Sequence, residues 1–538
     1  MEKKIFTISE NHHENYLATI QRVGELYPIE NSDRLCRAVV DGFDVIVPNT
    51  MKPEDIVVYV PVESALCEGY LAANNDYEIS EWQRNSNANE VGVLLAKGDP
   101  ESRATAKSKV GFFGKNGRVR IVKLRGVPSC GYIAPVSSLE TYNSALVGMN
   151  WETLIGTSFD EILGEKFCWK YVAPVKETAN GSHRRERKRE KTIKRFDRII
   201  PGTFTFHYDT THINKEMWKF SPDDVVTISV KVHGTSAIFA NIPTNRKLSF
   251  VEKIKKFFGK KIETVEYGNI YSSRNTIKNR YLNPDAHDYY NVDVWGVVND
   301  MFGPYIDKGM TVYGEIVGYV PGSADGAMIQ KRHDYGCEPG EWKFMPYRIS
   351  TITGDGTKVE WNLTEVDEWT HNLVKEHPEL EKNVLFLDIL YHGRFGDLYP
   401  DIDEHLHWQE NVLERMKNDK EHFLMEELEP KCRLYEPEYN AAVAAYEKAK
   451  TNGEPKKVLK TLQEEIDKWY ALRAPREGVV IRKDNDPIAE AWKLKTNAHR
   501  FGVEARAHDE GEFDMEEAEG EGCDYADGQG AQNPNQTS

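Results

Sequence analysis

Residues 228–236 read Ile-Ser-Val-Lys-Val-His-Gly-Thr-Ser, a β-branched run that holds a lysine, with a glycine three residues after it. The isoleucine and the two valines alternate with other residues, which is typical of a half-buried strand. Gly234 ends the run, so we expect Lys231 near a strand-to-turn corner. A lysine held there can present its amine to a phosphate, because a glycine lets the backbone approach closely. Such a short pattern alone more often marks a solvated lysine beside a turn, so its meaning depends on the rest of the chain.

The composition is that of an ordinary globular protein, with 40% hydrophobic and 29% charged residues among 538. A chain of this length predicts two or three domains. No apolar run approaches a membrane helix of about 20 residues and no signal peptide is evident, so we expect no membrane partner. The seven cysteines are scattered without a Cys-x-x-Cys pair. This spacing disfavours a disulfide framework or a zinc ribbon and predicts a cytoplasmic protein.

The net charge of −17 does not exclude a nucleic-acid partner, because the charge is unevenly distributed. Residues 509–538 contain ten acidic residues and neither Lys nor Arg, which leaves −7 for the rest of the chain. We predict that the tail 506–538 is disordered.

The N-terminal residues 1–140 are predicted to be mostly short strands separated by turn residues, which suggests an OB-like β-barrel that binds nucleic acid. Within them, residues 117–126 alternate basic and aliphatic side chains. On a strand this alternation would place Arg118, Arg120 and either Lys123 or Arg125 on the surface, and these four residues are the candidates for following a phosphate backbone. A merely solvated strand face is an equally good interpretation.

The remaining chain is predicted to form a connecting region and a larger domain. Residues 141–200 include a basic run, 184–195, which we interpret as a flexible linker with nucleic-acid contact as a second possibility. Residues 201–505 mix strand and helix patterns, and apolar residues at helical spacing dominate an insertion over about 353–473. The predicted class is therefore α+β.

Further short segments follow the lysine stretch in a fixed order: 271–275 (Tyr-Ser-Ser-Arg-Asn), 312–318 (Val-Tyr-Gly-Glu-Ile-Val-Gly), 344–349 (Phe-Met-Pro-Tyr-Arg-Ile), 476–482 (Arg-Glu-Gly-Val-Val-Ile-Arg) and 491–495 (Ala-Trp-Lys-Leu-Lys). Glu315 and Glu477 stand next to glycines beside β-branched runs, which predicts strand ends for both. The period of two places Lys493 and Lys495 on one face of a strand.

This ordered set resembles the motifs of the covalent nucleotidyltransferases, the superfamily of ATP-dependent ligases and mRNA capping enzymes. Lys-x-His-Gly-Thr is similar to the RNA ligases of its second branch. An OB-like module ahead of the transferase is similar to one RNA ligase family, whose members seal nicks with an RNA 3′-OH end. The resemblance implies a ligase-type domain of antiparallel sheets with flanking helices. It covers about residues 5–140 and 200–500.

The resemblance also implies roles for individual residues. Lys231 would be the nucleophile that becomes AMP-lysine, and Glu477 would hold a catalytic Mg²⁺ or Mn²⁺. The other implied ATP-binding positions are Lys493 and Lys495 on the α-phosphate, Gly234 at the turn, Glu315 on a ribose hydroxyl, Tyr347 stacked on adenine, and Arg274 on the ribose or a 5′-phosphate. Secondary candidates are His233, Arg482 and, as the alternative stacking residue, Phe344.

The implied activity is ATP-dependent joining of 3′-OH and 5′-phosphate ends at nicks in an RNA-containing duplex, as in RNA repair, by a monomer. A capping-type guanylyltransferase and a nucleic-acid-binding protein with an inactive transferase domain are the alternatives. Two positions depart from the family pattern: Val230 stands where many relatives have an acid, and Tyr347-Arg348-Ile349 replaces Phe-Asp-Ile. Both positions are expected near the base, so the choice of ATP over GTP stays open.

Overall fold

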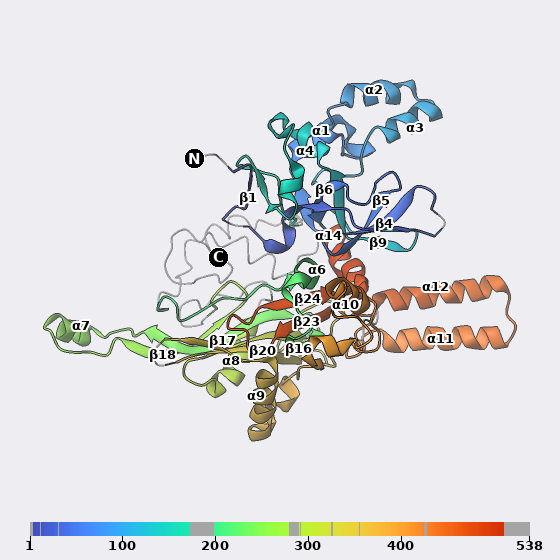
Figure 1. The fold of residues 1–538 in the computed structure, drawn as a ribbon. Coiled ribbons are helices and arrows are strands. Elements are labelled where there is room, and N and C mark those ends of the chain that lie inside the picture. Colours follow the sequence, from blue (N-terminus) through green and yellow to red (C-terminus); the bar gives the residue numbers. More distant parts are fainter. Residues whose placement is uncertain are drawn as a thin grey trace. The chain divides into compact units, whose positions relative to one another are not determined.

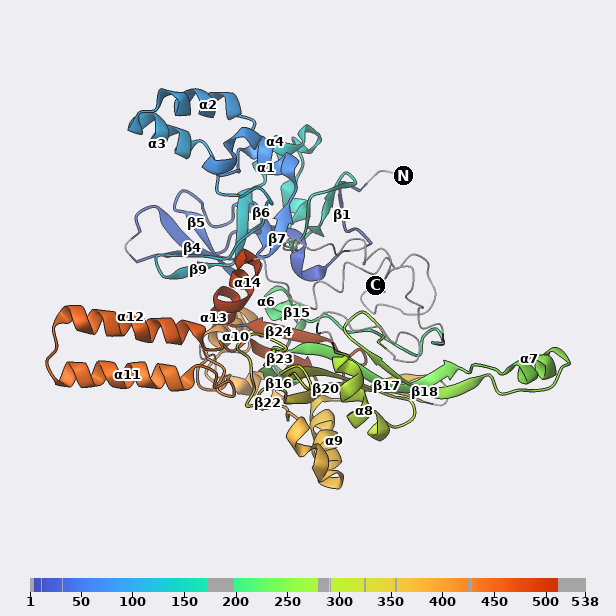
Figure 2. The ribbon, with the colours of Figure 1, turned by 180° about the vertical axis from the view of Figure 1, so that it is seen from behind.

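The computed structural model describes residues 4–10, 12–30, 32–172, 198–278, 290, 292–323, 326–353, 356–423, 425 and 428–510. The chain forms two compact units, one of residues 1–173 and 211–217 and the other of 174–210 and 218–538 (Figures 1 and 2). The predicted basic linker at 184–195 and nearly all of the predicted disordered tail lie outside the described residues. The predicted domain boundaries at 140, 200 and 505 stay predictions.

The first unit is built mainly from short antiparallel strands. Its largest sheet has the order β10-β6-β2-β11, formed by Gly131–Pro135, Ile56–Pro61, Ala18–Arg22 and Ser158–Phe159. A second sheet is β3-β4-β5, formed by Leu26–Pro28, Leu35–Val40 and Phe43–Pro48, and a third is β1-β12-β13, formed by Phe6–Thr7, Glu161–Ile162 and Glu165–Lys166. Two further antiparallel pairs complete the unit. The strands β8 (Val122–Leu124) and β9 (Val127–Ser129) form a hairpin, whereas β7 (Ser64–Leu66) pairs with the distant β14 (Cys168–Lys170). The helices are α1 (Glu68–Asn74), α2 (Ala88–Lys97), α3 (Pro100–Ser108), α4 (Ser137–Tyr142) and α6 (Ile213–Glu216).

The β4–β5 hairpin shows how the local sequence sets the turns of this unit. Val40 pairs with Phe43, which leaves Asp41 and Gly42 as a two-residue loop with φ of 52° and 75°. An Asp-Gly pair suits this turn, because both of its residues need a positive φ. The strands predicted around residues 17–20, 39–47 and 56–60 are confirmed. In the described residues the strand ladders of this unit do not close into a ring, so the OB-like barrel stays a prediction.

The surface position predicted for Arg118 is wrong. Its side chain is only 2% exposed and makes two bonds of 2.8 Å to the carboxylate of Glu63. Residues 117–126 are not one strand, since Arg118 makes an isolated bridge and the regular strand begins at Val122. The buried carboxylate recruits the guanidinium inward, because a buried charge needs a partner. The other three predicted basic residues, Arg120, Lys123 and Arg125, are exposed.

The second unit has an α+β fold with two antiparallel sheets, which confirms the predicted class. One sheet places strands β24 (Ala491–Lys495), β23 (Gly478–Lys483), β16 (Val225–Lys231) and β22 (Ile389–Arg394) side by side in that order. The other has the order β18-β17-β19-β20-β21, formed by Val265–Ser272, Thr235–Asn245, Met310–Gly318, Trp342–Ile352 and Lys358–Glu360. The strands β16 and β17 are separated only by residues 232–234, so the lysine stretch links the two sheets.

The main core of this unit includes residues from both sheets and from the helices α8 (Val294–Phe302) and α9 (Leu363–Glu376). Val230 and Val232, which flank the lysine, are 5% and 7% exposed and belong to this core. Their burial fixes the backbone on both sides of Lys231, so the lysine has a defined position.

The stretch 353–473 contains the helices that its periodicity predicts: α9, α10 (Trp408–Lys417), α11 (Glu436–Thr451) and α12 (Lys456–Leu472). In both views α11 and α12 form a hairpin that extends from the unit (Figures 1 and 2). The same stretch also supplies β22, which pairs with β16. The predicted insertion is therefore partly built into the sheet that carries Lys231.

No helix in the described part of the chain is both long and apolar enough to cross a bilayer. The cysteines that the structure describes are all free thiols.

Candidate active site

The pairing of three adjacent strands brings the two predicted lysines together. Lys231 is the last residue of β16, as predicted, and pairs with Gly478, the first residue of β23. Gly478 in turn pairs with Lys495, the last residue of β24. Residues directly opposite each other in a sheet lie on the same face. Lys231 and Lys495 therefore share one face, although 264 positions separate them in the sequence.

Only glycine fits between the two lysines. Gly478 has a φ of 146°, and a Cβ added to it would lie 2.0 Å from the carbonyl oxygen of Leu494. Any side chain at this position would push β24 away from β23. The glycine thus lets both lysine-bearing strands approach the turn at Glu477.

Glu477, directly before β23, is the centre of the cluster. Its Oε1 atom lies 3.0 Å from Nζ of Lys231 and 3.2 Å from Nζ of Lys495. The carboxylate is 3% exposed, and Lys495 also pairs with Glu504. Burial alone would raise the pKa of Glu477, but the charges of Lys231 and Lys495 outweigh it and hold that pKa well below its ordinary value. The carboxylate is thus ionised and able to bind cations.

Lys493 lies on the same face of β24 as Lys495, as the period of two predicts. Burial lowers the pKa of Lys493 well below its ordinary value, and the neighbouring charges of Lys495 and Lys231 lower it further. The charges of Asp209 and Arg274 also act on Lys493, and Arg274 itself pairs with Asp209. A group of cations this dense favours a ligand with several negative charges.

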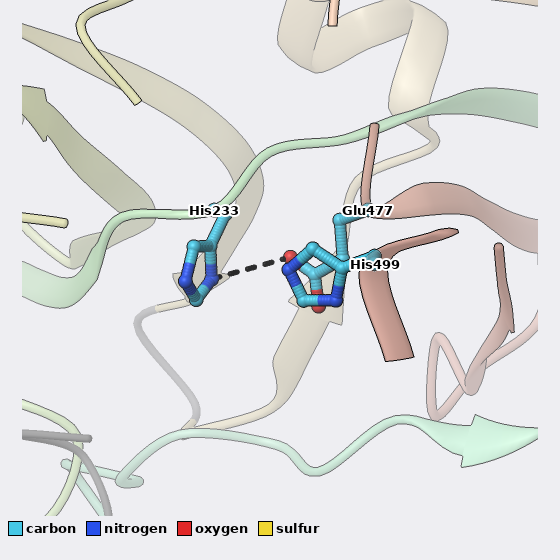
Figure 3. Close-up of side chains that lie close together, drawn as sticks. All are labelled: His233, Glu477 and His499. Carbon is cyan, nitrogen blue, oxygen red and sulfur yellow. Dashed lines mark ion pairs between the residues drawn. The ribbon is translucent and has the colours of Figure 1, made fainter. Parts of the chain in front are cut away.

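A second face of Glu477 is lined by two histidines (Figure 3). Nδ1 of His233 lies 3.6 Å from Oε2 of Glu477, and one ligand atom from each of His233, Glu477 and His499 falls within 4.8 Å of the others. Among the described residues, Oε2 of Glu477 and both ring nitrogens of His499 have no hydrogen-bond partner, although all three atoms are buried. Burial lowers the pKa of His499 well below its ordinary value, which keeps its imidazole neutral. Unpaired buried nitrogen and oxygen atoms in this arrangement fit a divalent cation, and two imidazoles beside one carboxylate suit a transition metal better than Mg²⁺.

Gly234 and Glu315 meet at the turn after Lys231. The backbone N–H of Gly234 donates to Oε1 of Glu315 over 3.1 Å. A Cβ at Gly234 would lie 2.4 Å from the carbonyl oxygen of Ile316, so glycine is required there as well. The sequence predicts a strand end for Glu315, and this prediction is wrong, because Glu315 lies inside β19. It stands next to a shift in the pairing of β19 with β20, between Tyr313 and Gly314. That irregularity re-aims the carboxylate toward the turn.

The two candidates for stacking on a base are placed differently. Tyr347 is half-buried, and its hydroxyl lies 3.1 Å from Nδ1 of His207, which also contacts Ser236 at 3.1 Å. Phe344 is 1% exposed and packs against Phe239 and Phe302 with ring centroids 5.1 and 5.3 Å away. Phe344 is therefore a core residue, and Tyr347 is the better placed of the two for a ligand.

Two arginines of the motif segments bind other parts of the second unit. Arg482 is buried and donates to the backbone carbonyls of Trp361 and Tyr347 over 2.8 and 3.3 Å. Arg348, which departs from the Phe-Asp-Ile pattern of the motif that the sequence resembles, pairs with Glu360 at 3.0 Å and lies 3.4 Å above the ring of Tyr208. This departure is thus explained by a buried ion pair.

Three residues of the site escaped the sequence-based prediction: His499, Glu504 and Asp209. His499 follows Lys495 by four positions, within α13 (Asn497–His499), and Glu504 ends the next helical turn. A predicted helical turn directly after the second lysine motif would have suggested both. Asp209 pairs with Arg274. No local pattern marks it, since an isolated acid 65 positions before its partner has no signature.

Comparisons with known proteins give matches of fold only. No protein-family model matches the chain, and no curated protein matches it significantly. Among solved structures, mutants of an RNA ligase from Naegleria gruberi with ATP and Mn and with AMP and Mn share 16% identity with this chain, at TM-scores of 0.46 and 0.47. The same ligase with PPi shares 15% identity at a TM-score of 0.44. Each alignment covers 91% of this chain and 99–100% of the other.

At TM-scores below 0.5, this likeness carries no inference about activity. A function for the chain has to be argued from its own residues.

Proposed function

We propose that this protein is an ATP-dependent RNA ligase that works through a covalent lysyl–AMP intermediate. The observation that carries the proposal is the contact of Lys231 and Lys495 with a single buried carboxylate, Glu477, across three adjacent strands. Lysine, carboxylate and further cations in one place suit nucleophilic attack on a phosphate.

In the first step, the amine of Lys231 attacks the α-phosphorus of ATP. A nitrogen–phosphorus bond forms, the bond to the bridging oxygen breaks, and pyrophosphate leaves with its electron pair. Lys493 and Lys495 would offset the charge on the α-phosphate, and Tyr347 would contact the adenine. The attacking amine gives up a proton to solvent as the nitrogen–phosphorus bond forms, and the carboxylate of Glu477, 3.0 Å from Nζ, holds the amine in position.

A divalent cation, when bound, would neutralise phosphate charge in this site. Glu477, His233 and His499 are the residues that would hold it. Oε1 of Glu477 faces the two lysines, and Oε2 is directed toward His233.

In the later steps, the AMP moves from Lys231 to a 5′-phosphate end, and a 3′-OH then displaces AMP to form a phosphodiester bond. Arg274, which pairs with Asp209, would hold the incoming 5′-phosphate, as the motif resemblance implies. We propose a nicked duplex with RNA at the 3′-OH side as the substrate. The exposed basic residues of the first unit, Arg120, Lys123 and Arg125, support this choice of a polyanion.

The test is incubation with Mg²⁺ or Mn²⁺ and α-labelled ATP or GTP in parallel, followed by a denaturing gel. Label from ATP supports a ligase, whereas label from GTP alone would indicate a capping-type guanylyltransferase. No label from either would leave only a nucleic-acid-binding protein. Sealing is then compared on nicks with RNA or DNA at the 3′-OH side, and equal rates would contradict the RNA preference.

Lys231→Ala is expected to lower labelling by at least about 10³-fold, because it removes the amine that forms the bond to phosphorus. The matched control is Lys375→Ala, an exposed lysine on α9. Peptide mass spectrometry of the wild type should place AMP on Lys231. Label retained by Lys231→Ala would assign the nucleophile to another residue.

A further inference from the structure

The helix α7 (Phe250–Phe257) carries the densest group of exposed apolar side chains in the described part of the chain. It lies between β17 and β18, outside every motif of the proposed active site. The exposed residues of this apolar stripe are Phe250 (77%), Val251 (58%), Ile254 (42%), Phe257 (85%) and Phe258 (76%). A soluble surface normally scatters such residues singly, so this cluster requires an explanation.

The sequence of α7 is amphipathic. Its apolar residues recur at positions i, i+1, i+4, i+7 and i+8, which gather on one side of a helix with 3.6 residues per turn. By the same geometry, Lys253 and Lys255 lie on opposite borders of this stripe. Long lysine side chains in those positions can extend outward while the stripe is buried.

The segment is strongly basic in an acidic protein. Residues 246–264 contain seven Lys or Arg and two Glu, whereas the whole chain has a net charge of −17. Glu252 is already bound by Arg246 at 2.7 Å and by the backbone of Ser249. The structure shows no ion pair, among the residues it describes, for the five lysines of the helix and its exit: Lys253, Lys255, Lys256, Lys260 and Lys261. Their charge is available to an anionic partner.

The start of the helix is held by its own side chains. Ser249 and Glu252 make a reciprocal capping box at its start, and Arg246 holds Glu252 from outside the helix. A helix that is already ordered loses less conformational entropy when it binds. The amphipathic stripe is therefore presented ready for contact.

The position of α7 suits a flat surface. In both views it lies at the far end of β17 and β18, away from the other elements of its unit (Figures 1 and 2). An element that protrudes in this way can reach a planar partner without contacts from the rest of its unit. The short helix does not need the roughly 20 apolar residues of a spanning segment, on which the expectation of no membrane partner rested.

We propose that α7 binds the surface of an anionic lipid bilayer, with its apolar stripe in the interface and its lysines on the acidic headgroups. The charge on both borders of the stripe favours a lipid surface over a protein groove, since an extended negative surface satisfies lysines in every direction. This inference does not depend on the proposed ligase activity.

The experiment is sedimentation of the full-length protein with vesicles of phosphatidylcholine alone or with about one-third phosphatidylglycerol. We expect binding to the anionic vesicles only, weakened when NaCl is raised from about 0.1 M to about 0.5 M. Phe257→Ser/Phe258→Ser should lower the partition constant by at least about 10-fold, because both rings leave the interface. Lys255→Glu/Lys256→Glu should lower it by a similar factor.

The control is Val93→Ser/Leu406→Ser, which removes two apolar side chains that are 63% and 61% exposed elsewhere. This variant should bind vesicles like the wild type, and every variant should keep the far-UV circular dichroism spectrum and the unfolding midpoint of the wild type, so that a failure to fold is recognised. Absence of binding to anionic vesicles overturns the proposal. So does binding that depends on the lysines but not on the phenylalanines and is displaced by duplex RNA, which would make α7 a general polyanion contact.

Discussion

At the scale of single residues, Glu477 connects the parts of the site. One of its oxygens faces Lys231 and Lys495, and the other is directed toward His233 and lies near His499. A carboxylate shared in this way couples the charge of Lys231 to the binding of a cation, because both are stabilised by the same negative charge.

Glu477→Gln should test this link. The amide keeps the shape of the side chain but removes its charge, so we expect labelling with ATP to fall by at least about 100-fold. The measurement is the rate of label incorporation over a titration of Mn²⁺ and of Mg²⁺. Glu376→Gln, an exposed acid on α9, is the matched control. An unchanged metal requirement in Glu477→Gln would place the cation on other residues.

At the scale of elements, a buried ion pair joins several strands. Arg348 of β20 bonds to Glu360 of β21 and donates to the carbonyls of Ile488 and Ala489, in the connection between β23 and β24. Lys358 adds a second contact to Glu360 at 3.0 Å. The pair thus holds the second sheet to the hairpin that carries the two motif lysines.

Glu360→Gln should therefore destabilise the unit in a pH-dependent way. Burial would raise the pKa of Glu360, but Arg348 and Lys358 outweigh it and lower that pKa below its ordinary value of 4.5. A lowered pKa means that the carboxylate stabilises the fold above about pH 4.5 and loses this effect as the pH falls further. We expect a loss of about 3 kcal/mol in unfolding free energy near pH 7, shrinking below about pH 4. Urea unfolding of wild type and variant, followed by tryptophan fluorescence, measures this loss near pH 7 and below about pH 4. An equal loss at the two pH values would contradict a stabilising role of the ionised Glu360.

Gly478→Ala tests the junction between strands β23 and β24. The new Cβ would meet the carbonyl oxygen of Leu494 at 2.0 Å, and φ is 146°. We expect a loss of about 2–4 kcal/mol in stability and at least about 100-fold in labelling, because Lys495 would move away from Glu477. Gly502→Ala is the control, since its Cβ would make only an ordinary contact of 3.7 Å with Pro475. A stable, fully active Gly478→Ala would show that the lysine spacing tolerates a shift.

At the scale of the whole molecule, basic residues of the first unit divide into two groups with different expected effects. Arg120, Lys123 and Arg125 are exposed, whereas Arg118 is buried against Glu63. Neutralising the three exposed residues to Ala should weaken duplex binding and reduce the slope of log K against log salt by about 2–3, with Lys231 labelling unchanged. Arg118→Ala should instead lower the unfolding midpoint. Filter binding over a salt series and thermal unfolding separate these effects, and an unchanged slope would remove this face as a phosphate contact.

Local sequence patterns predicted more of the second unit than of the first. In the second unit, the strand containing Lys231, the shared face of Lys493 and Lys495, and the four helices between 363 and 472 follow from periodicity, because each rests on a local pattern. In the first unit, alternation predicts a surface position for Arg118, yet a distant buried carboxylate draws this residue inward. A side chain that pairs over 55 positions has no local signature.

The sequence by itself determined which residue types carry the chemistry and where each lies within its own strand, since a period of two is a property of the local backbone. Only the tertiary structure decided which of these residues meet. Strand pairing brings Lys231, Gly478 and Lys495 into one row, and a helical turn returns His499 to Glu477. Burial among Phe239 and Phe302 removes Phe344 from the candidates for a base contact. The reason is physical: pairing, burial and orphaned polar atoms arise from contacts between segments far apart in the chain, and no single segment encodes them.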